Sequence, residues 1–398
     1  MTTPDTPGKD DGFEPALSAN GRFVAFWSFA SNLVPDDSNG FGDVFVRDRK
    51  TGRTTRVSVD HTGKDASSVS LRPAISTSGR FVAFESFATD IVPGDGNASA
   101  DVFLRDLKSG QSMRVSVDSA GGEGNGNSFE AAMSSSGRVV AFSSTSTNLV
   151  VGDGNGQSDV FLRDMKSGKT SRVSVDSAGI EANEGSFAPA VSSSGRFVAY
   201  SSLADNLVDG DLNAKRDVFV HDRKTQRTSR VSVDSAGLEG DGDSSEPAVS
   251  SNGRFVAFVS ESTNLVAGDV NARRDVFVHD RTTGETTRVS LDSAGVEGNG
   301  HSSSPAVSSS GRFVAFVSES TNLVPGDVNA KRDVFVHDRK TGQTRRVSVD
   351  PTGTDADGHS GAPAVSAKGR FTAFESAATN LIPDDVNGVV DVFVHDAK

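Results

Sequence analysis

Residues 311–316 read Gly-Arg-Phe-Val-Ala-Phe, and close copies of this stretch recur along the chain at a constant spacing of 58 residues. The seven copies start at Gly21, Gly79, Gly137, Gly195, Gly253, Gly311 and Gly369. Each copy precedes an Asp-Val-Phe stretch, which starts at Asp43, Asp101, Asp159, Asp217, Asp275, Asp333 and Asp391. A unit of this length cannot bury its apolar face alone, so seven units in register predict one stacked or closed body. We therefore interpret residues 1–398 as a single domain whose units start near residues 13, 71, 129, 187, 245, 303 and 361.

Each repeat is expected to form four short strands. In the sixth unit, residues 305–308, 312–318, 333–338 and 344–349 are apolar, β-branched or aromatic, and Gly, Ser, Asn and Asp separate them. No segment has a sustained 3.6-residue period, so no helix is predicted. We name the strands A, B, C and D in chain order. Their A–B and C–D connections are short turns, whereas the B–C and D–A connections are long loops.

An antiparallel meander of these strands places the two kinds of connection on opposite faces, which we call the short-turn face and the long-loop face. Seven such meanders predict an all-β, seven-bladed β-propeller of four-stranded blades. Strand A is expected to line the axis, because it carries a small residue at a fixed position, from Ala16 to Ala364. Function is expected on the long-loop face, since binding and catalytic groups concentrate on loops held by a rigid scaffold.

Closure of the ring is the weak point of this prediction. Strand D follows strand C six times, at residues 54–59, 112–117, 170–175, 228–233, 286–291 and 344–349, but Lys398 comes directly after the seventh strand C. In strict register Thr2 matches Asp60, so a seventh strand D would lie before Met1. We expect residues 1–12 to pair with strand C of the last blade, where Pro4 restricts them to an edge position. The alternative is a three-stranded last blade.

The repeat resembles the TolB-like, WD-repeat-related propeller repeat. The resemblance is carried by Pro-Ala-Val-Ser-Ser-Ser-Gly-Arg-Phe-Val-Ala-Phe at 305–316, Asp-Val-Phe-Val-His-Asp at 333–338 and Thr-Arg-Arg-Val-Ser at 344–348. The chain departs from the family in two ways, because aliphatic residues replace the strand-A tryptophan and the B–C loop is longer. Members of the family include protein-binding scaffolds of the bacterial envelope, and similar blades occur in peptidases and lyases. The resemblance alone implies a periplasmic or secreted location and leaves the activity undecided.

Composition and charge narrow the range of partners. The formal net charge is −13, which repels nucleic acid and anionic membranes, so neither is expected as a partner. The sequence contains no cysteine, which excludes disulfide scaffolds, thiolate metal sites and cysteine nucleophiles. No apolar run is long enough for a membrane span. We expect a monomer that presents an acidic long-loop face to a protein or a glycan.

The B–C loop carries the sharpest motif, Asp-x-Asn-x-x-x-Asp, in all seven units. Hard cations such as calcium take several oxygen ligands from one tight loop, and this spacing could supply them. The predicted metal ligands are Asp37, Asn39, Asp43, Asp95, Asn97, Asp101, Asp153, Asn155, Asp159, Asp211, Asn213, Asp217, Asp269, Asn271, Asp275, Asp327, Asn329, Asp333, Asp385, Asn387 and Asp391. Acids of the D–A loop, such as Glu123 and Glu181, are expected on the same face.

A purely structural role for the motif is the competing interpretation, because Asp and Asn side chains build turns by bonding nearby backbone. A basic pair in units four to six, for example Lys215-Arg216, weakens the case for calcium there. Units one, two, three and seven are the better candidates. A structural role is also expected for the histidines of strand C, which share one repeat position with arginine. These are His221, His279, His337 and His395, and we expect each to bond the adjacent Asp or a neighbouring blade.

Two classes of function remain at this point. The first is a non-catalytic binding or scaffold propeller, because nearly every polar feature recurs in each blade and active sites are usually asymmetric. The second is a hydrolase or lyase at the mouth of the channel. One position just before strand A departs from the repeat, where Glu14, Arg72, Glu130 and Glu246 stand against Ala188, Ser304 and Ala362. We expect no enzyme, no catalytic residue and no cofactor other than calcium.

Overall fold

The computed structural model describes residues 8–383 and 385–397, which form strands joined by turns and loops and contain no helix. The first three blades comprise β1 (Gly12–Leu17), β2 (Phe23–Ser28), β3 (Asp43–Asp48), β4 (Arg53–Arg56), β5 (Ser70–Ile75), β6 (Phe81–Ser86), β7 (Asp101–Asp106), β8 (Gln111–Arg114), β9 (Ser128–Met133), β10 (Val139–Ser144), β11 (Asp159–Asp164) and β12 (Lys169–Arg172). The next three comprise β13 (Ser186–Val191), β14 (Phe197–Ser202), β15 (Asp217–Asp222), β16 (Arg227–Arg230), β17 (Ser244–Val249), β18 (Phe255–Ser260), β19 (Asp275–Asp280), β20 (Glu285–Arg288), β21 (Ser302–Val307), β22 (Phe313–Ser318), β23 (Asp333–Asp338) and β24 (Gln343–Arg346). The last blade comprises β25 (Ser360–Val365), β26 (Phe371–Ser376) and β27 (Asp391–Asp396).

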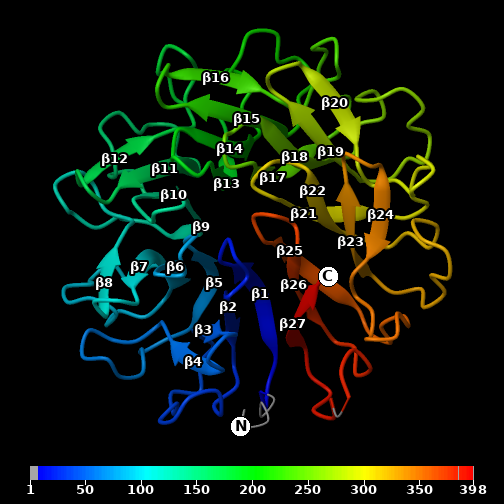
Figure 1. The fold of residues 1–398 in the computed structure, drawn as a ribbon. Helices are drawn as coiled ribbons and strands as arrows, with labels where there is room; N and C mark the ends of the chain where they lie inside the picture. Colours follow the sequence, from blue (N-terminus) through cyan, green and yellow to red (C-terminus); the bar gives the residue numbers. More distant parts are fainter. Residues whose placement is uncertain (1–7, 384, 398) are drawn as a thin grey trace.

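These strands form a seven-bladed ring, as the sequence predicts (Figure 1). Each sheet is an antiparallel meander in chain order, for example β21-β22-β23-β24, with Ala315 of β22 opposite both Ala306 and Val336. The A-type strands of neighbouring blades lie beside one another around the centre, and the D-type strands form the rim (Figure 1). Within the described residues, no helix is long and apolar enough to cross a membrane.

The core is divided among the interfaces between blades. Six buried apolar clusters each join two neighbouring blades, from blades one and two to blades six and seven. Between blades five and six, Val289 of the rim packs with Phe316 and Leu323 of the next blade, and all three are buried. Both faces of a blade are apolar because both are covered, which explains the continuous apolar pattern of strands B and C.

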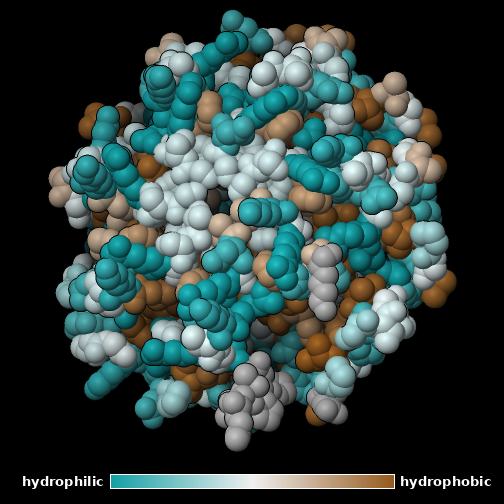
Figure 2. Space-filling model, viewed as in Figure 1, coloured by the Kyte–Doolittle hydropathy of each residue, from teal (hydrophilic) through white to brown (hydrophobic). Residues whose placement is uncertain are grey.

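The inner turns form a closed hydrogen-bonded circle on the short-turn face. The amide of Ala19 donates to the carbonyl of Thr77, and the same bond repeats from blade to blade until the amide of Ala367 donates to the carbonyl of Ala19 at 3.0 Å. Figure 2 shows one face of the ring, where residues of intermediate hydropathy gather around a small central opening. Two features of each inner turn require its glycine, namely a positive φ angle and a close approach to the preceding blade. At Gly311 the φ angle is 76°, and an added Cβ would lie 2.1 Å from Phe255 of the preceding blade.

The seventh blade has three strands among the described residues. We predicted that residues 1–12 pair with its strand C, and only residues 8–12 of this segment are described. Residues 1–7 lie outside the described residues. Residues 8–12 occupy the place of a D–A loop, because Gly12 donates to the carbonyl of Val390 as Ser70 donates to that of Gly42 in the first blade. The ring is therefore joined at its axis, while β27 has no rim strand among the described residues.

Candidate functional site: the long-loop face

The motif carboxylates converge on an arginine that the sequence analysis did not single out. In blade five, Nη1 of Arg288 lies 3.0 Å from Asp269, 3.3 Å from Asp275 and 2.9 Å from Glu297. Arg288 ends the D-type strand β20, Asp269 and Asp275 come from the B–C loop and strand C, and Glu297 comes from the D–A loop. A guanidinium therefore supplies the positive charge around which this loop folds.

The same arrangement occurs in the first six blades. The nearest arginine-to-oxygen distances are 3.0–3.5 Å to the first motif aspartate and 3.2–3.8 Å to the second. The six arginines are Arg56, Arg114, Arg172, Arg230, Arg288 and Arg346, and each also pairs with an acid of the D–A loop. Their recurrence in an Arg-Val-Ser stretch was the signal in the sequence that could have revealed them.

The asparagine of the motif builds the turn. Nδ2 of Asn271 donates to Asp275 at 2.9 Å and to the carbonyl of Gly298 at 3.0 Å, while its Oδ1 accepts from the amide of Arg273. The hydroxyl of Ser290 in turn donates to the other oxygen of Asp275 at 2.5 Å. Burial raises the pKa of Asp269 to about 6, and Arg288 opposes this rise. The placement of these residues thus agrees with the competing interpretation, in which Asp and Asn build the turn.

The hydrogen bonds and ion pairs of these loops decide whether calcium could bind in them. Asn271 turns its NH₂ group toward the carboxylate, and a guanidinium already lies between the two aspartates. A metal ion would have to displace the arginine, so the first six loops do not fit calcium as they are folded. Among the described residues no group of three or more His, Asp or Glu side chains is arranged to hold a metal ion. The motif aspartates are also buried, so they do not form the acidic surface that we expected on this face.

The loop of the seventh blade differs from the other six. Asn387 donates to Asp391 at 2.7 Å, as in the other blades. The described residues contain no D-type strand here, so Asp391 has neither the serine nor the arginine partner of its counterparts. Oδ1 of Asp385 is buried without a hydrogen-bond partner among the described residues, as is Oδ1 of Asp269 in blade five, so it is the arginine nearby that sets the other loops apart. Burial raises the pKa of both Asp385 and Asp391, and the calcium prediction stays open only at this loop.

The strand-C histidines have structural partners that differ from the expected adjacent aspartate. Nδ1 of His279 lies 2.9 Å from Oγ1 of Thr286 on strand D, and this hydroxyl donates to the carbonyl of Val233 in the preceding blade. Arg47, at the same position in blade one, bonds Thr54 in the same way. Burial lowers the pKa of His279. The position therefore links strand C to strand D in the first six blades. His395 instead lies 3.3 Å from Nη1 of Arg345 in the neighbouring blade, which is one of the two expected kinds of partner.

Two further histidines stand in the D–A loops and act as acceptors. Nδ1 of His301 accepts from the amide of Arg274, and Nδ1 of His359 accepts from the amide of Arg332, both at 3.0 Å. They therefore join the two long loops of their blades.

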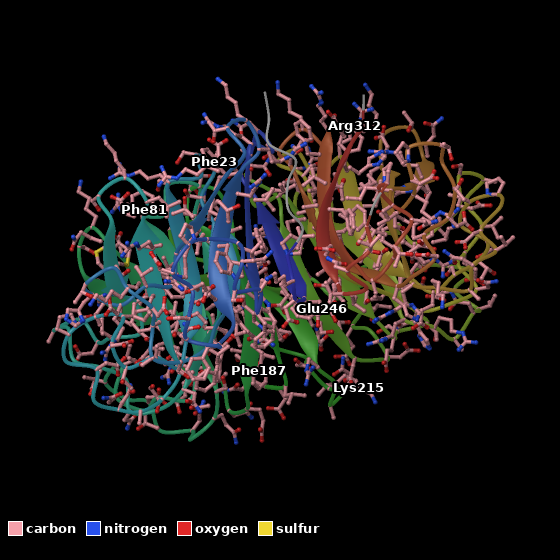
Figure 3. The ribbon with its side chains drawn as sticks, turned by 90° about the horizontal axis from the view of Figure 1, so that it is seen from below. Phe23, Phe81, Phe187, Lys215, Glu246 and Arg312 are labelled. Atoms are coloured by element: carbon pink, nitrogen blue, oxygen red, sulfur yellow. The ribbon has the colours of Figure 1, made fainter. Side chains whose placement is uncertain are left out.

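The asymmetric position before the small residue of strand A is backbone-strained in every blade. Its φ angle lies between 44° and 57° at Glu14, Arg72, Glu130, Ala188, Glu246, Ser304 and Ala362, none of which is glycine. The strand register breaks at this point, as between Phe13 and Ala16. Figure 3 views the ring edge-on and places Glu246 and the loop residue Lys215 toward the face opposite to Arg312.

The acids at this mouth of the channel are hydrogen-bonded to neighbouring blades. Glu130 accepts from the amide of Ala188, and Glu246 accepts from that of Ser304, both at 2.7 Å. The amide of Glu130 itself donates to the buried Glu85 at 3.1 Å. These carboxylates accept hydrogen bonds from the amides of the strained positions, so they are not simply solvated charges at the mouth of the channel.

One side of the mouth also holds an arginine, which lies beside two acids. Arg72 lies 3.5 Å from Glu14 and 3.5 Å from Glu85, and the indole of Trp27 donates to Glu14 at 3.0 Å. Burial raises the pKa of Glu85, and Arg72 opposes this rise. An acid with a raised pKa beside an arginine is the kind of group that general acid–base chemistry uses.

The loop tips carry exposed aliphatic side chains in four consecutive blades. Leu212, Val270, Val328 and Val386 occupy the middle of the Asp-x-Asn triplet and are 84%, 81%, 85% and 87% exposed. We call these four residues the aliphatic arc. The sequence analysis did not identify them, although their repeat position was readable: units one to three have Ser or Gly there.

The comparisons with known proteins agree with this architecture. No protein-family model and no curated protein matches the chain. The β-propeller domain of the Trilobed protease from Pyrococcus furiosus superimposes with a TM-score of 0.59 at 10% identity, covering 98% of this chain and 96% of that domain. Oligogalacturonate lyase from Vibrio parahaemolyticus gives 0.55 at 12% identity, covering 99% and 92%. These likenesses show the fold alone, which is a seven-bladed β-propeller.

TolB itself is a more distant match in shape. TolB from Acinetobacter baumannii is 14% identical over 76% of this chain, and the TM-score of 0.44 is too low to support an inference about the fold. This chain spans 58% of that protein's length. The propeller fold predicted from the repeat is confirmed, whereas neighbours that include a lyase and a protease domain leave the activity undecided.

Proposed function

We propose that this chain is a non-catalytic binding propeller that takes a protein partner on its long-loop face. The repeated polar groups favour this over catalysis, because carboxylates, histidines and arginines are used in hydrogen bonds within and between blades. A residue such as His279 is buried and bonded through Nδ1 to Thr286, so it does not face a substrate at the surface.

The aliphatic arc is the observation that carries the proposal. Single exposed aliphatic residues are common on protein surfaces, but here one position is aliphatic and more than four-fifths exposed in four successive blades. Leu212 and its counterparts make no contribution to the blade cores, so the fold gives no reason for their chemistry. Burial against a partner supplies one.

Basic residues beside the arc indicate the charge of the partner. Lys215 and Arg273 are exposed three residues beyond Leu212 and Val270, and Arg332 is exposed in the sixth loop. The whole chain has a net charge of −13, so an acidic partner would be repelled by most of the surface and attracted at these loops. We therefore infer an acidic protein surface as the partner.

Catalysis at the mouth of the channel is the second candidate. It is favoured by Arg72 between Glu14 and the buried Glu85, a group that occurs once in the ring. The solved neighbours that carry a lyase or protease name are consistent with it at the level of fold. A hydrolase or lyase would use Glu85 as the acid or base and Arg72 as the group that binds an anionic substrate.

Calcium is retained as a proposal for the seventh loop. Asp385 and Asp391 offer carboxylate oxygens without an arginine between them among the described residues. Asn387 would supply its Oδ1 to a cation only after turning its amide group, because its Nδ2 now faces Asp391.

A binding and turnover experiment separates these functions. The chain is titrated with panels of acidic proteins, basic proteins and glycans, and it is assayed with polyuronide and peptide substrates. We expect saturable binding of acidic proteins that weakens at least tenfold when Leu212, Val270, Val328 and Val386 are all changed to Ser. Met113→Ser on the rim, where the side chain is 40% exposed, is the matched control and should bind normally.

The same experiment can contradict the proposal. Preference for glycans, with no effect of the four serine substitutions, would exclude the protein partner. Turnover of a substrate that is lost in Glu85→Gln, with binding unchanged, would establish the enzyme in place of the binding module.

A further inference from the structure

The charges of the chain are divided unequally between the two faces of the ring. The short-turn face consists of the A–B and C–D turns, at residues 19–22 and 48–53 in the first blade and at the corresponding positions of the other six, as far as residue 397. These turns contain 20 Arg or Lys and 8 Asp or Glu, which is a net charge of +12. The whole chain has a net charge of −13, so the remainder of the sequence carries −25.

An arginine in each A–B turn forms an inner ring on this face. Arg312 donates from Nε and Nη2 to the two oxygens of Asp338, and its side chain is 41% exposed. The aspartate occupies only these two nitrogens, so the guanidinium can donate from Nη1 to a second anion. The pair recurs in every blade, with the arginines Arg22, Arg80, Arg138, Arg196, Arg254, Arg312 and Arg370.

The surplus of positive charge comes from the C–D turns. Arg53, Lys169 and Arg227 are exposed where these turns end. The amide of Lys340 donates to Asp338 at 3.0 Å, which fixes the tip of the turn and leaves the ammonium group in solvent. An exposed lysine has this amide bond in five blades, at Lys50, Lys108, Lys166, Lys224 and Lys340.

The fold holds these charges at one level. The A–B turns are joined into a circle by backbone bonds, and Arg339 of a C–D turn donates to the carbonyl of Gly311 at 2.9 Å. The same arginine lies over the ring of Phe255 in the preceding blade, 4.5 Å from its centroid. Figure 3 shows the ring edge-on, with nitrogen-tipped side chains projecting from the face on which Arg312 lies. The short-turn face is therefore a flat, basic ring.

The shape and composition of this face favour one kind of anion. A planar anionic surface contacts the whole ring at once, whereas a nucleic-acid duplex crosses it along one line and meets only part of the charge. Within the described residues, none of the exposed large apolar side chains lies in these turns, so the face offers no aromatic platform for single-stranded bases and nothing to insert into lipid tails. Attraction to this face is therefore electrostatic.

The acidic remainder of the chain does not cancel this attraction. Strand β22 has six residues and is about 20 Å long, and the long loops begin at its far end. Charges in water are screened over about 8 Å at physiological ionic strength. An anionic surface beside the short turns is therefore attracted by these turns and screened from the long loops. The expectation that anionic membranes are repelled was based on the net charge, which averages over both faces.

We propose that the short-turn face docks on an anionic lipid bilayer, whose headgroups are bound by the C–D turn lysines and by Nη1 of the A–B turn arginines. Basic side chains are attracted to such a surface within a Debye length of it. In this orientation the axis of the ring is perpendicular to the bilayer, and the long-loop face with the aliphatic arc points away from it. The inference goes beyond the proposed function and does not depend on a partner at the arc.

Vesicle sedimentation tests the proposal. The whole chain is mixed with vesicles of phosphatidylcholine alone and with vesicles that contain about one third phosphatidylserine. We expect at least tenfold tighter binding to the anionic vesicles in about 0.1 M salt, and loss of this preference in about 0.5 M salt. Equal binding to both kinds of vesicle, or binding to neither, would overturn the proposal.

Two triple variants with the same change in net charge show which face is responsible. Replacement of Lys108, Lys166 and Lys224 by Gln should weaken binding to anionic vesicles at least tenfold. Replacement of Lys215, Arg273 and Arg332 by Gln, on the long-loop face, should leave it unchanged. All six side chains are exposed, so both variants should keep the thermal midpoint of the parent chain. An equal loss of binding in the two variants would mean that net charge alone acts, and this would overturn a specific face.

A dye attached to one cysteine reports the orientation on the vesicle. The chain contains no cysteine, so an introduced thiol is unique. Thr282→Cys places the dye in a C–D turn of blade five, and Val270→Cys places it at a long-loop tip of the same blade; both positions are exposed. A quencher attached to the lipid headgroups should quench the first dye and not the second. Quenching of the second dye alone would overturn the proposed orientation.

The remaining outcomes identify a different partner. Tighter binding to a DNA duplex or to a soluble anionic polysaccharide than to anionic vesicles would overturn a bilayer as the partner. The four serine substitutions in the aliphatic arc should leave vesicle binding unchanged, because the arc lies on the opposite face. Failure of the acidic-protein experiment with vesicle binding intact would therefore reject the proposed function alone, and the reverse result would reject the docking surface alone.

Discussion

The interface between blades five and six and the interface between blades seven and one use the same residue types, but among the described residues only the first has its rim strand. At the first, Val289 covers Phe316 and Leu323, and Arg288 neutralises Asp269 and Asp275. At the second, the counterparts Phe26 and Leu33 are half-buried beside a groove, and no buried apolar cluster of the six found spans these two blades.

The comparison shows that the axis and the rim of the propeller are held together by different contacts. The inner turns are joined all the way round, including Ala367 to Ala19, so the axis needs no rim strand to close. The rim strand instead completes the apolar core between blades and supplies the charge that makes buried loop acids tolerable. Carboxylates removed from water need a hydrogen-bonded cation, and in six blades an arginine from strand D provides it.

The largest expected effect compares Phe316→Ala with Phe26→Ala. Phe316 is fully buried, so its loss should reduce the free energy of unfolding by about 3–5 kcal/mol. Phe26 already borders open space, and its loss should cost less than about half of that. Urea denaturation of both variants measures the difference, with Phe258→Ala as a second filled-interface control. Equal losses at Phe26 and Phe316 would mean that the groove is filled in solution.

A smaller effect is expected at the second aspartate of the motif. Asp275→Asn disturbs bonds from Ser290, Asn271 and Arg288, and it should reduce the free energy of unfolding by roughly 2 kcal/mol. The Asp391 side chain accepts a bond from Asn387 and lacks the serine and arginine partners among the described residues. Asp391→Asn should therefore change the free energy of unfolding by less than about 0.5 kcal/mol. The same denaturation measurement decides this. A large loss at Asp391 would reveal a partner already in place there.

A pH effect should be common to all blades, because each has a two-pronged pair on the short-turn face. Arg312 donates to both oxygens of Asp338 at 2.7 and 2.6 Å, and Arg370 pairs with Asp396 in the same way. Arg312 lowers the pKa of Asp338 from 3.8 to about 2. A folded-state pKa below the unfolded value adds stability that is present above pH 4 and is lost as pH falls through 2.

Thermal unfolding between pH 2 and pH 5 measures this acid dependence. Arg312→Met and Arg370→Met should each weaken it to a similar degree, since the filled and the open interface both keep this pair. A weaker effect at Arg370 would show that the missing rim strand also loosens the short-turn face.

The smallest expected effect concerns calcium at the seventh loop. Calcium in excess over chelator should raise the free energy of unfolding by about 1 kcal/mol or less, because a ligand of the folded state stabilises it by mass action. Asp385→Asn should remove this increment, and Asp327→Asn should retain it, since Arg346 already serves that loop. No shift of the thermal midpoint would reject calcium at this loop. An increment that Asp385→Asn leaves intact would place the ion elsewhere.

Most of the strands could be predicted from residue patterns. β23 spans Asp333–Asp338, as the sequence predicts, and β22 begins one residue later than expected, at Phe313. Strand D is shorter than predicted, because β24 ends at Arg346 and Val349 instead forms an isolated bridge with Asp355. Strand A begins earlier, at Ser302, since its polar start pairs with Ser318 and gives no apolar signal.

The candidate site was predicted less well. The motif located the correct loops, but a carboxylate pattern does not say whether a metal ion, a turn or an arginine neutralises it. Asp269 and Arg288 are separated by strand C and a turn, so only the register of β19 with β20 shows that they meet. The aliphatic arc was also missed, because exposure is a property of the folded loop and not of Leu212 or Val270 alone.

The sequence by itself determined the blade count, the strand order, the short inner turns and the assignment of both long loops to one face, because these follow from local patterns repeated at a constant spacing. Only the tertiary structure decided which charges pair, which side chains are exposed and how the inner turns close the ring. Those properties depend on contacts between blades and across strands. A repeat whose residues are the same in every unit can still meet a different neighbour in one of them, as β27 does.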